Sequence, residues 1–424
     1  MNNVLSAAFR ELQEIVNDLE FKDQARKRVE DFSRDGKIKF AELIYFILKS
    51  SKTSISTAIR RFFEEMGKEE MKVTQQSLSE ARAKLTVWAF THIFERVTVI
   101  PMMKSATKTW NNYFVYAVDG SKIALPVDRF GRLLEYYGSV GRGCKSPTAQ
   151  ASILYDVMND IIIDAAVEPI DTDERTLALR HIDAFKKLNI HDQALAIFDR
   201  GYPSYELIKE LEEAGIKYVM RVRKKFNLDI DAQVANDGEI WLYNKNKTEK
   251  LKVRIVKVML DSGETEVLIT NLFDEKLTPS DFKRLYFKRW PVESKYDIVK
   301  NKLKVESFTS QTVEGIQQDF FATMFMANIM STVEAGIKEE LDKQRNGKEN
   351  KYEYKINKNE LISILKDHFI VALSHESSEK QLEELEKVLN LAQRYVVPIR
   401  PDRKNPRNPN PRKSKHHHNQ KHNA

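Results

Sequence analysis

Residues 113–126 read YFVYAVDGSKIALP, and this stretch decides how the chain is expected to fold. Its first six residues are apolar, aromatic or β-branched, which predicts a buried strand. The sequence Asp119-Gly120-Ser121 predicts a tight turn after that strand, and residues 122–126 predict a second strand. A carboxylate on a rigid strand end is a candidate catalytic group, although such an aspartate often only caps a turn.

A second strand ends in the same way. Residues 194–198 read ALAIF and are followed by Asp199-Arg200-Gly201. Two carboxylates on neighbouring strands can hold divalent cations through hard oxygen ligands. Around these segments, alternation and helical periodicity predict strands at 149–157, 161–166 and 217–223, and helices at 174–188 and 205–214.

Residues 224–275 predict an antiparallel sheet. They alternate apolar and polar side chains between Asp-Gly and Ser-Gly turns, with strands expected at 240–243, 250–259 and 265–271. This sheet is interpreted as an insertion before the next helix. Thr278-Pro279 predicts the start of that helix, because Thr is a good N-cap and Pro suits the first helical position.

The segment YFKRWPVESKYDIVK, residues 286–300, is expected to direct one carboxylate, cationic groups and a phenol to one side. Its proline is expected to end one helix and open the next, so that Glu293 lies near a helix start. Lys300 lies two turns further on and is expected on the same face. Tyr286 and Arg289 lie one turn apart at the end of the preceding helix. A solvated helix face with salt bridges would give the same charge spacing.

The spacing Tyr286-x2-Arg289-x3-Glu293-x6-Lys300 resembles the Y-R-E-K signature of the insertion-sequence-four family of DDE transposases. The segments around the two aspartates, 116–126 and 198–203, resemble the same family. So do residues 149–163 and 270–272. The resemblance covers roughly residues 110–335, in the family's order.

This resemblance implies an α/β catalytic core with a ribonuclease-H-like fold. Such a core has a mixed five-stranded sheet flanked by helices, with an antiparallel β insertion before the last catalytic residue. Asp119 would lie on the first strand, Asp199 after the fourth strand and Glu293 on a later helix.

The implied chemistry is two-metal phosphoryl transfer by a Mg²⁺-dependent DNA nuclease and strand transferase. Asp119, Asp199 and Glu293 would hold two Mg²⁺ ions, for which Mn²⁺ can substitute. The enzyme would cleave the ends of its insertion sequence and join the freed 3′-OH groups to target DNA, which is cut-and-paste transposition. The implied contacts with DNA phosphates are made by Tyr286, Arg289, Lys300 and Arg221.

The implied partners are double-stranded DNA, as inverted-repeat ends and as target, and a second copy that forms a homodimer on DNA. The composition agrees with a polyanionic partner only weakly, with 69 basic against 62 acidic residues and a net charge of +7. The single cysteine, Cys144, excludes an internal disulfide and argues against a cysteine-built zinc site. Residues 1–20 lack the features of a signal peptide, and no run of about 18 apolar residues predicts a membrane span. A cytoplasmic bacterial protein, associated with the nucleoid when it acts, is therefore expected.

Four regions are predicted along the chain. Residues 1–105 form a helical N-terminal domain, in which helices at 54–66 and 75–94, the second capped by Thr74, form either a DNA-reading helix-turn-helix or an ordinary bundle. Residues 106–340 form the catalytic core. Residues 341–397 form a helical C-terminal region suited to dimerisation, and residues 398–424 form a basic tail that is expected to be disordered.

Three other functions remain open at this point. A ribonuclease-H-like nuclease or domesticated recombinase would share the same acidic triad. A DNA-binding regulator would have an inactive core. A phosphoryl-transfer enzyme that does not act on DNA predicts a phosphate-cradling loop, but residues 138–143, GSVGRG, lack the Gly-Lys-Ser/Thr ending.

Overall fold

The structure is a computed structural model that describes residues 2–34, 36–141, 143, 146–345, 352–375 and 377–400. The chain divides into two compact units. Phe94–Met324 form one unit, named here the core unit, and Met1–Ile93 with Phe325–Ala424 form the helical unit. The four regions expected from the sequence have other boundaries than these two units, and they stay a prediction.

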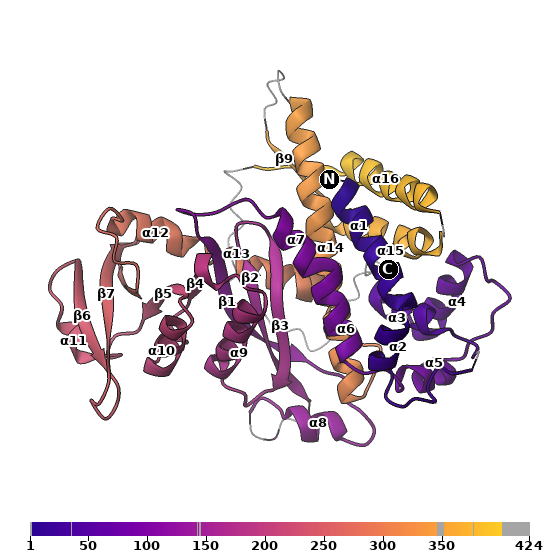
Figure 1. The fold of residues 1–424 in the computed structure, drawn as a ribbon, viewed down its shortest axis with the longest axis horizontal. Coiled ribbons are helices and arrows are strands. Elements are labelled where there is room, and N and C mark those ends of the chain that lie inside the picture. Colours follow the sequence, from indigo (N-terminus) through magenta and orange to yellow (C-terminus); the bar gives the residue numbers. More distant parts are fainter. Residues whose placement is uncertain are drawn as a thin grey trace. The chain divides into compact units, whose positions relative to one another are not determined.

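One mixed sheet of eight strands forms the centre of the core unit, in the order β3-β2-β1-β4-β5-β8-β7-β6 (Figure 1). The strands are β1 (Phe114–Ala124), β2 (Thr148–Asp156), β3 (Ile161–Pro169), β4 (Ala194–Phe198), β5 (Lys217–Val222), β6 (Asp237–Tyr243), β7 (Lys250–Met259) and β8 (Thr265–Thr270). Strand β4 runs parallel to β1 and to β5, and the other neighbours pair antiparallel. The first five strands confirm the mixed sheet expected of a ribonuclease-H-like core. The predicted insertion is β6 to β8, which extend this same sheet because β8 pairs with β5.

Strand β1 is continuous, and the predicted turn at Asp119-Gly120-Ser121 is wrong. Strand β2 pairs with β1 without interruption from Tyr116 to Ala124, and Asp119 lies opposite Ile153 in this ladder. The long partner strand satisfies the backbone groups of an Asp-Gly sequence that would otherwise favour a turn. Asp119 therefore lies in the middle of a strand, on a more rigid mount than a strand end.

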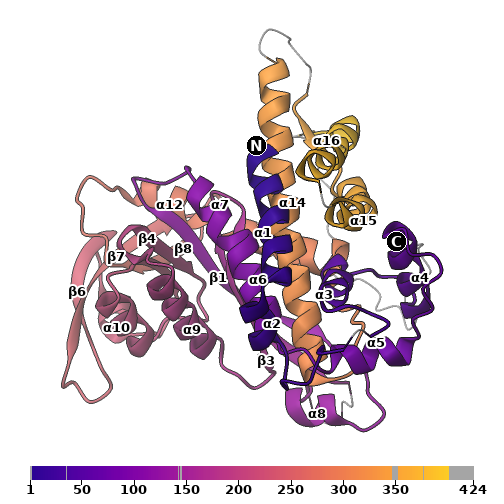
Figure 2. The ribbon, with the colours of Figure 1, turned by 45° about the vertical axis from the view of Figure 1, so that its right-hand side comes forward.

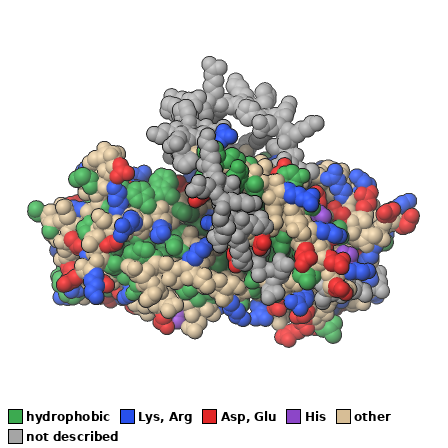
Figure 3. Space-filling view, turned by 90° about the horizontal axis from the view of Figure 1, so that it is seen from above, with side chains coloured by type: hydrophobic (Ala, Val, Ile, Leu, Met, Phe, Trp, Pro, Cys, Tyr) green, Lys and Arg blue, Asp and Glu red, His purple; other side chains and the backbone are tan. Residues whose placement is uncertain are grey.

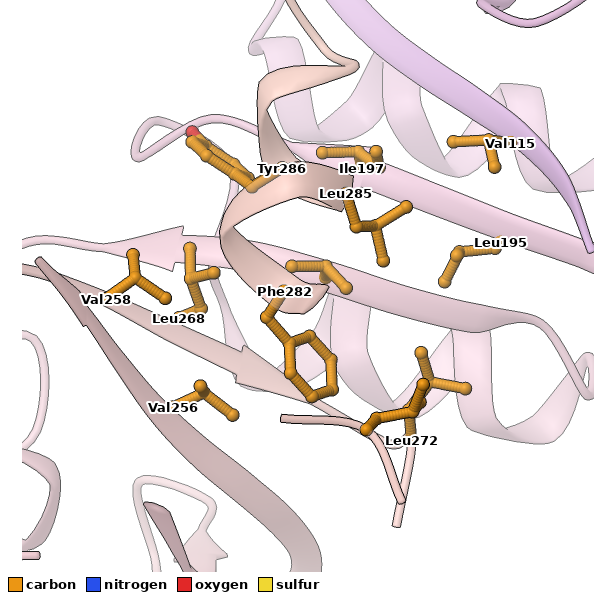
Figure 4. Close-up of a cluster of buried hydrophobic side chains, with 12 residues drawn as sticks. Val115, Leu195, Ile197, Val256, Val258, Leu268, Leu272, Phe282, Leu285 and Tyr286 are labelled. Atoms are coloured by element: carbon orange, nitrogen blue, oxygen red, sulfur yellow. The ribbon is translucent and has the colours of Figure 1, made fainter. Parts of the chain in front are cut away.

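Helices cover both faces of the sheet. Tyr116 of β1 packs edge-on against Phe185 of α9 (Glu174–Lys187), with 4.9 Å between ring centroids. The next side chain back, Val115, belongs to a buried cluster with Phe282 of α12 (Pro279–Phe287) on the other face (Figure 4). Successive side chains of a strand point to opposite faces, so α9 and α12 lie on opposite sides of β1.

The buried cluster anchors α12 against the sheet. Its members come from β1, β4, β5, β7, β8, the segment between β8 and α12, and α12 itself: Val115, Leu195, Ile197, Val219, Val256, Val258, Leu268, Leu272, Leu277, Phe282, Leu285 and Tyr286. Figure 4 shows Tyr286 with its ring directed along the sheet and its hydroxyl at the edge of this cluster. The apolar packing thus fixes the end of α12 from which the predicted site residues follow.

The remaining elements of the core unit are short. They are η1 (Phe94–Val99), α7 (Ile100–Ser105), α8 (Arg132–Tyr137), η2 (His191–Gln193), α10 (Tyr205–Glu213), α11 (Leu228–Ala232), α13 (Pro291–Asp297) and η3 (Ile298–Lys302). The predicted strands and helices of this unit agree with the observed ones to within a few residues, apart from the turn in β1. Thr278 caps α12 in a capping box with Asp281, as predicted from its sequence.

The helical unit contains α1 (Asn2–Asn17), α2 (Leu19–Ala25), α3 (Phe40–Lys49), α4 (Ile55–Glu65), α5 (Gln75–Arg82), α6 (Trp88–Ile93), α15 (Lys358–Ser374) and α16 (Ser378–Arg394), with a small sheet of β9 (Tyr354–Ile356) and β10 (Val396–Pro398). Figure 2 shows α15 and α16 side by side. Thr74 caps α5, as predicted. The predicted helix at 75–94 is wrong as one element, because Leu85 leaves the helix to form a β-bridge with Arg26. The predicted basic tail lies outside the described residues from residue 401 on.

Helix α14 (Val313–Arg345) belongs to both units. Between Val313 and Glu340 it is long and apolar enough to cross a membrane by length and composition alone. However, 83 % of its most apolar window is buried inside the protein, as in the core helix of a soluble protein. Its hydropathy is therefore weak evidence for a membrane span.

Candidate active site

The parallel pairing of β1 with β4 sets the two predicted catalytic aspartates side by side. Ala117 of β1 lies opposite Ile197 of β4. Asp119 and Asp199 each follow that pair by two residues, so they stand at the same level on neighbouring strands. Since side chains alternate along a strand, Asp119 shares the α12 face with Val115. Asp199 directly follows β4, as expected.

The end of α12 and the start of α13 supply the third predicted acid. Proline opens α13 as its first residue, and Glu293 is the third residue of that helix. The Tyr286 hydroxyl donates to Oδ1 of Asp199 over 3.2 Å. Arg289 Nη2 donates to Oε1 of Glu293 over 2.7 Å. The sequence segment 286–293 therefore contacts one aspartate directly and holds the glutamate by an ion pair.

Two partly buried contacts hold α13 in place. Lys295, whose side chain is 1 % exposed, forms an ion pair of 2.7 Å with Asp160 in the β2–β3 turn. The Tyr155 hydroxyl donates to the same Asp160 oxygen over 2.6 Å. On the next residue, the Tyr296 hydroxyl donates to the backbone carbonyl of Asp119 over 3.0 Å. The charged segment is thus not a fully solvated helix face, because one of its lysines fastens the helix to the sheet.

Asp119 lies in a cluster of mutually interacting charges. Burial raises the pKa of Asp119 to about 6, against the opposing effect of the Arg289 guanidinium, while Glu293 and Glu174 add to the rise. Arg289 is only 6 % exposed, and its Nε has no hydrogen-bond partner. Glu174 was not predicted as a site residue. A first-turn glutamate is common in helices, so only its tertiary surroundings distinguish it.

The acidic side chains lie in one region but are not arranged as the ligands of a metal ion. Among the described residues, no three Asp, Glu, His or Cys side chains lie close enough to hold a metal together. Glu293 is paired with the Arg289 guanidinium, and Asp199 accepts a hydrogen bond from the Tyr286 hydroxyl. The donors nevertheless fit a divalent cation chemically, because carboxylate oxygens are hard ligands and added positive charge would stabilise the desolvated Asp119.

The two other basic residues predicted to contact DNA have protein partners in this arrangement. Lys300 Nζ donates to the backbone carbonyl of Lys122. The chain changes from α- to π-helix at Ile298, within the interval from Glu293 to Lys300. The common face of these two residues stays a prediction. Arg221 of β5 forms an ion pair of 2.9 Å with Glu266 of β8.

The charge on the surface is mixed rather than segregated. On the face drawn in Figure 3, described Lys and Arg side chains are interspersed with Asp and Glu side chains and with apolar ones. The net charge of +7 is therefore not gathered into one basic field on that face.

The fold and site define a class: a ribonuclease-H-like α/β protein with two aspartates at one level of neighbouring parallel strands and a glutamate on a later helix. A family model described as "Transposase DDE domain" matches residues 112–329, which is just over half of the chain. The chain therefore belongs to this family of transposase domains.

Two individual proteins are similar to this chain. The "Putative transposase y4zB" of Sinorhizobium fredii (strain NBRC 101917 / NGR234) is 24 % identical over an alignment of 270 residues, and the match covers 59 % of this chain and 68 % of that protein. Among solved structures, a cryo-EM structure of the piggyBac transposase synaptic complex with hairpin DNA is similar with a TM-score of 0.48. That match has 10 % sequence identity and covers 90 % of this chain and 84 % of the other.

Proposed function

We propose that this chain is a cut-and-paste DNA transposase of the insertion-sequence-four family. It would cleave the ends of its own element by hydrolysis and then join the freed 3′-OH groups to target DNA. The observation that carries this proposal is the common level of Asp119 and Asp199, with Tyr286 and the Arg289–Glu293 pair beside them. Each of these residues belongs to the motifs on which the resemblance rests.

The acidic residues would act by holding divalent cations. Asp119, Asp199 and Glu293 would bind two Mg²⁺ ions, or Mn²⁺ in their place, which when bound would neutralise phosphate charge and acidify the attacking water or 3′-OH. Arg289 offers a buried N–H donor without a partner, which suits a phosphate oxygen. The Tyr286 hydroxyl donates to Asp199 and would orient it. Tyr286, Lys300 and Arg221 would also contact phosphates of the transposon end near the cut.

The proposed partners follow from this reaction. The substrates are the inverted-repeat ends of the element and a target duplex. Two ends must be cut and joined together, which a homodimer assembled on DNA would accomplish. The reaction takes place on chromosomal DNA, so we propose a cytoplasmic bacterial protein that associates with the nucleoid.

Cleavage of the element's own ends tests the proposal. The native protein is incubated with Mg²⁺ and a duplex carrying the inverted repeats that flank its gene, beside the variants Glu293→Gln and Glu275→Gln. Glu275 is an exposed glutamate before α12 and serves as the matched control. We expect nicks at the repeat ends with the native protein and with Glu275→Gln, and none with Glu293→Gln. Sequencing gels of end-labelled DNA give the position of each cut.

Other outcomes separate the competing functions. Equal cleavage by Glu293→Gln would remove Glu293 from the catalytic set. Cleavage of DNA without repeats, and no joined products with a target plasmid, would favour a ribonuclease-H-like nuclease. Binding of the repeats without cleavage by any variant would favour a DNA-binding regulator.

A further inference from the structure

Residues 127–132, VDRFGR, form a rigid turn between β1 and α8 (Figure 1). The buried Asp128 carboxylate accepts hydrogen bonds of 2.8 to 3.1 Å from the backbone N–H groups of Phe130 and of the first two residues of α8. Gly131, with a φ of +69°, has the left-handed conformation that lets the chain reverse here. The Leu133 side chain is fully buried, and α8 packs against β2 and β3. The backbone of this turn is therefore fixed before any partner binds.

The turn presents an exposed aromatic ring between two arginines. Phe130 is 73 % exposed, and the guanidinium carbons of Arg129 and Arg132 lie 5.9 and 5.1 Å from the centre of its ring. Single exposed apolar side chains are ordinary on protein surfaces, so exposure alone identifies nothing. Here, however, the ring is held on a fixed backbone, and both charged side chains that contact it are positive. A π face bordered by guanidinium groups suits a partner that combines aromatic rings with negative charge, as a nucleic acid does.

The turn continues the strand that carries Asp119. Five residue steps of β1 separate Asp119 from the end of the strand at Ala124, which is about 17 Å at about 3.4 Å per residue. The backbone N–H of Ala124 donates to Glu306 Oε1 over 3.0 Å, which ties the end of β1 to the segment that follows η3. A duplex advances by about 3.4 Å per base pair, so this distance corresponds to about five base pairs. A duplex held at Asp119 is therefore long enough to reach the turn within about ten base pairs.

We propose that Phe130 is a wedge that inserts between two neighbouring base pairs of the element-end duplex, while Arg129 and Arg132 bind the flanking phosphates. Apolar side chains inserted at a base step unstack it and bend the duplex, and arginines beside them offset the phosphate charge. The fixed turn lowers the cost of ordering this contact, because the ring is already held outside the surface. This inference rests on the proposed function, since it concerns the same DNA, but the contact lies away from the cut.

The competing explanation is that a protein covers the ring, either a second copy of this chain or another partner. A wedge unstacks the DNA at one base step, whereas a protein contact leaves the bases stacked. Phe130→Ala removes the ring, and Phe130→Tyr keeps a ring of the same width. Tyr395→Ala is the control, because it removes another exposed ring, 47 % exposed, from the helical unit.

Fluorescence of 2-aminopurine in the DNA tests the insertion directly, because this base analogue brightens where stacking is lost. It is placed at one position at a time, over about ten base pairs on each side of the cut, in the duplex with the repeat end. Divalent cations are omitted, so that no strand is cut. We expect one bright position with the native protein and with Phe130→Tyr, and none with Phe130→Ala. Phe130→Ala should also bind the duplex about 10-fold more weakly, while Tyr395→Ala should match the native protein in both measurements.

The two arginines have a separate readout in the salt dependence of DNA binding. Arg129→Gln and Arg132→Gln should each reduce the slope of log Kd against log salt concentration by about 1, because each removes one phosphate contact. Arg180→Gln is the matched control, since the Arg180 side chain is 55 % exposed in the same unit and pairs with Glu168. It should keep the native slope. An equal reduction in all three variants would reflect loss of net charge and would overturn the assigned phosphate contacts.

The outcomes separate this inference from the proposed function. If the native protein binds and cleaves the repeat ends but no position of the duplex brightens, the wedge is wrong and the proposed function stands. If Phe130→Ala sediments as a monomer where the native protein sediments as a dimer, the ring serves a contact between copies instead. If the native protein binds no repeat DNA, the wedge and the proposed function both fail. The melting temperatures of the free variants should match that of the native protein, because the ring is exposed.

Discussion

Replacing Asp119 by asparagine is expected to lower the rate of DNA-end cleavage by about 10³-fold, equivalent to about 4 kcal/mol of transition-state stabilisation. Asp119 is the aspartate most deeply embedded in the site, because its strand pairs with β2 on one side and β4 on the other. Asparagine keeps the shape of the side chain but loses the charge that a divalent cation needs. The protein should fold normally, since the β1 ladder uses only backbone groups.

The rate is measured in single turnover with end-labelled repeat DNA and saturating Mg²⁺. Asp192→Asn is the control, because Asp192 is an aspartate of the same unit whose side chain is 90 % exposed. A fall in rate that is no larger for Asp119→Asn than for this control would remove Asp119 from the catalytic set. Circular dichroism of both variants establishes that they are folded.

Replacing Asp160 by asparagine is expected to lower the free energy of unfolding by about 2 kcal/mol, because it leaves the buried Lys295 ammonium without its charged partner. The value is below that of a fully buried pair because the Asp160 side chain is 37 % exposed. The Lys295 side chain is 1 % exposed, and Asp160 accepts hydrogen bonds from both Lys295 and Tyr155. Asp160 has a φ of +59°, a backbone conformation that asparagine also tolerates. The substitution therefore removes the negative charge without adding backbone strain at this position.

Urea denaturation measures this loss, with Asp171→Asn as an exposed control in the same unit. The double variant Asp160→Asn with Lys295→Met should recover part of the stability, because no charge is then left buried. Cleavage should also slow in Asp160→Asn, since α13 carries Glu293. Unchanged stability in Asp160→Asn would show that the ion pair does not hold α13.

Local sequence patterns predicted most elements of the core unit. Apolar runs and alternation located β2 to β5 and the three inserted strands, and Thr278 located the start of α12. The continuity of β1 could not be predicted in this way. Whether Asp119-Gly120 forms a turn depends on the partner strand β2, which lies more than twenty residues further along the chain and fixes the backbone through pairing.

The candidate site was predictable where a motif is contiguous and not where it depends on tertiary contacts. Asp119, Asp199 and Glu293 were identified from strand ends and motif spacing, and the structure brings the two aspartates to one level. Glu174 and Lys295 carry no local signal that separates them from ordinary helix charges. Their surroundings come from strands and turns that are distant in sequence, so only the folded structure distinguishes them.

The register between β1 and β4 has a consequence for how copies of this gene can change. The connection between α9 and β4 can lengthen or shorten, because the level of Asp199 is set by strand pairing and not by the number of residues before it. A single codon inserted within the five residues of β4 would instead turn Asp199 to the α9 face, since strand side chains alternate. If the chain acts as proposed, such an insertion would produce a protein that folds but does not cleave, and that still occupies the repeat ends.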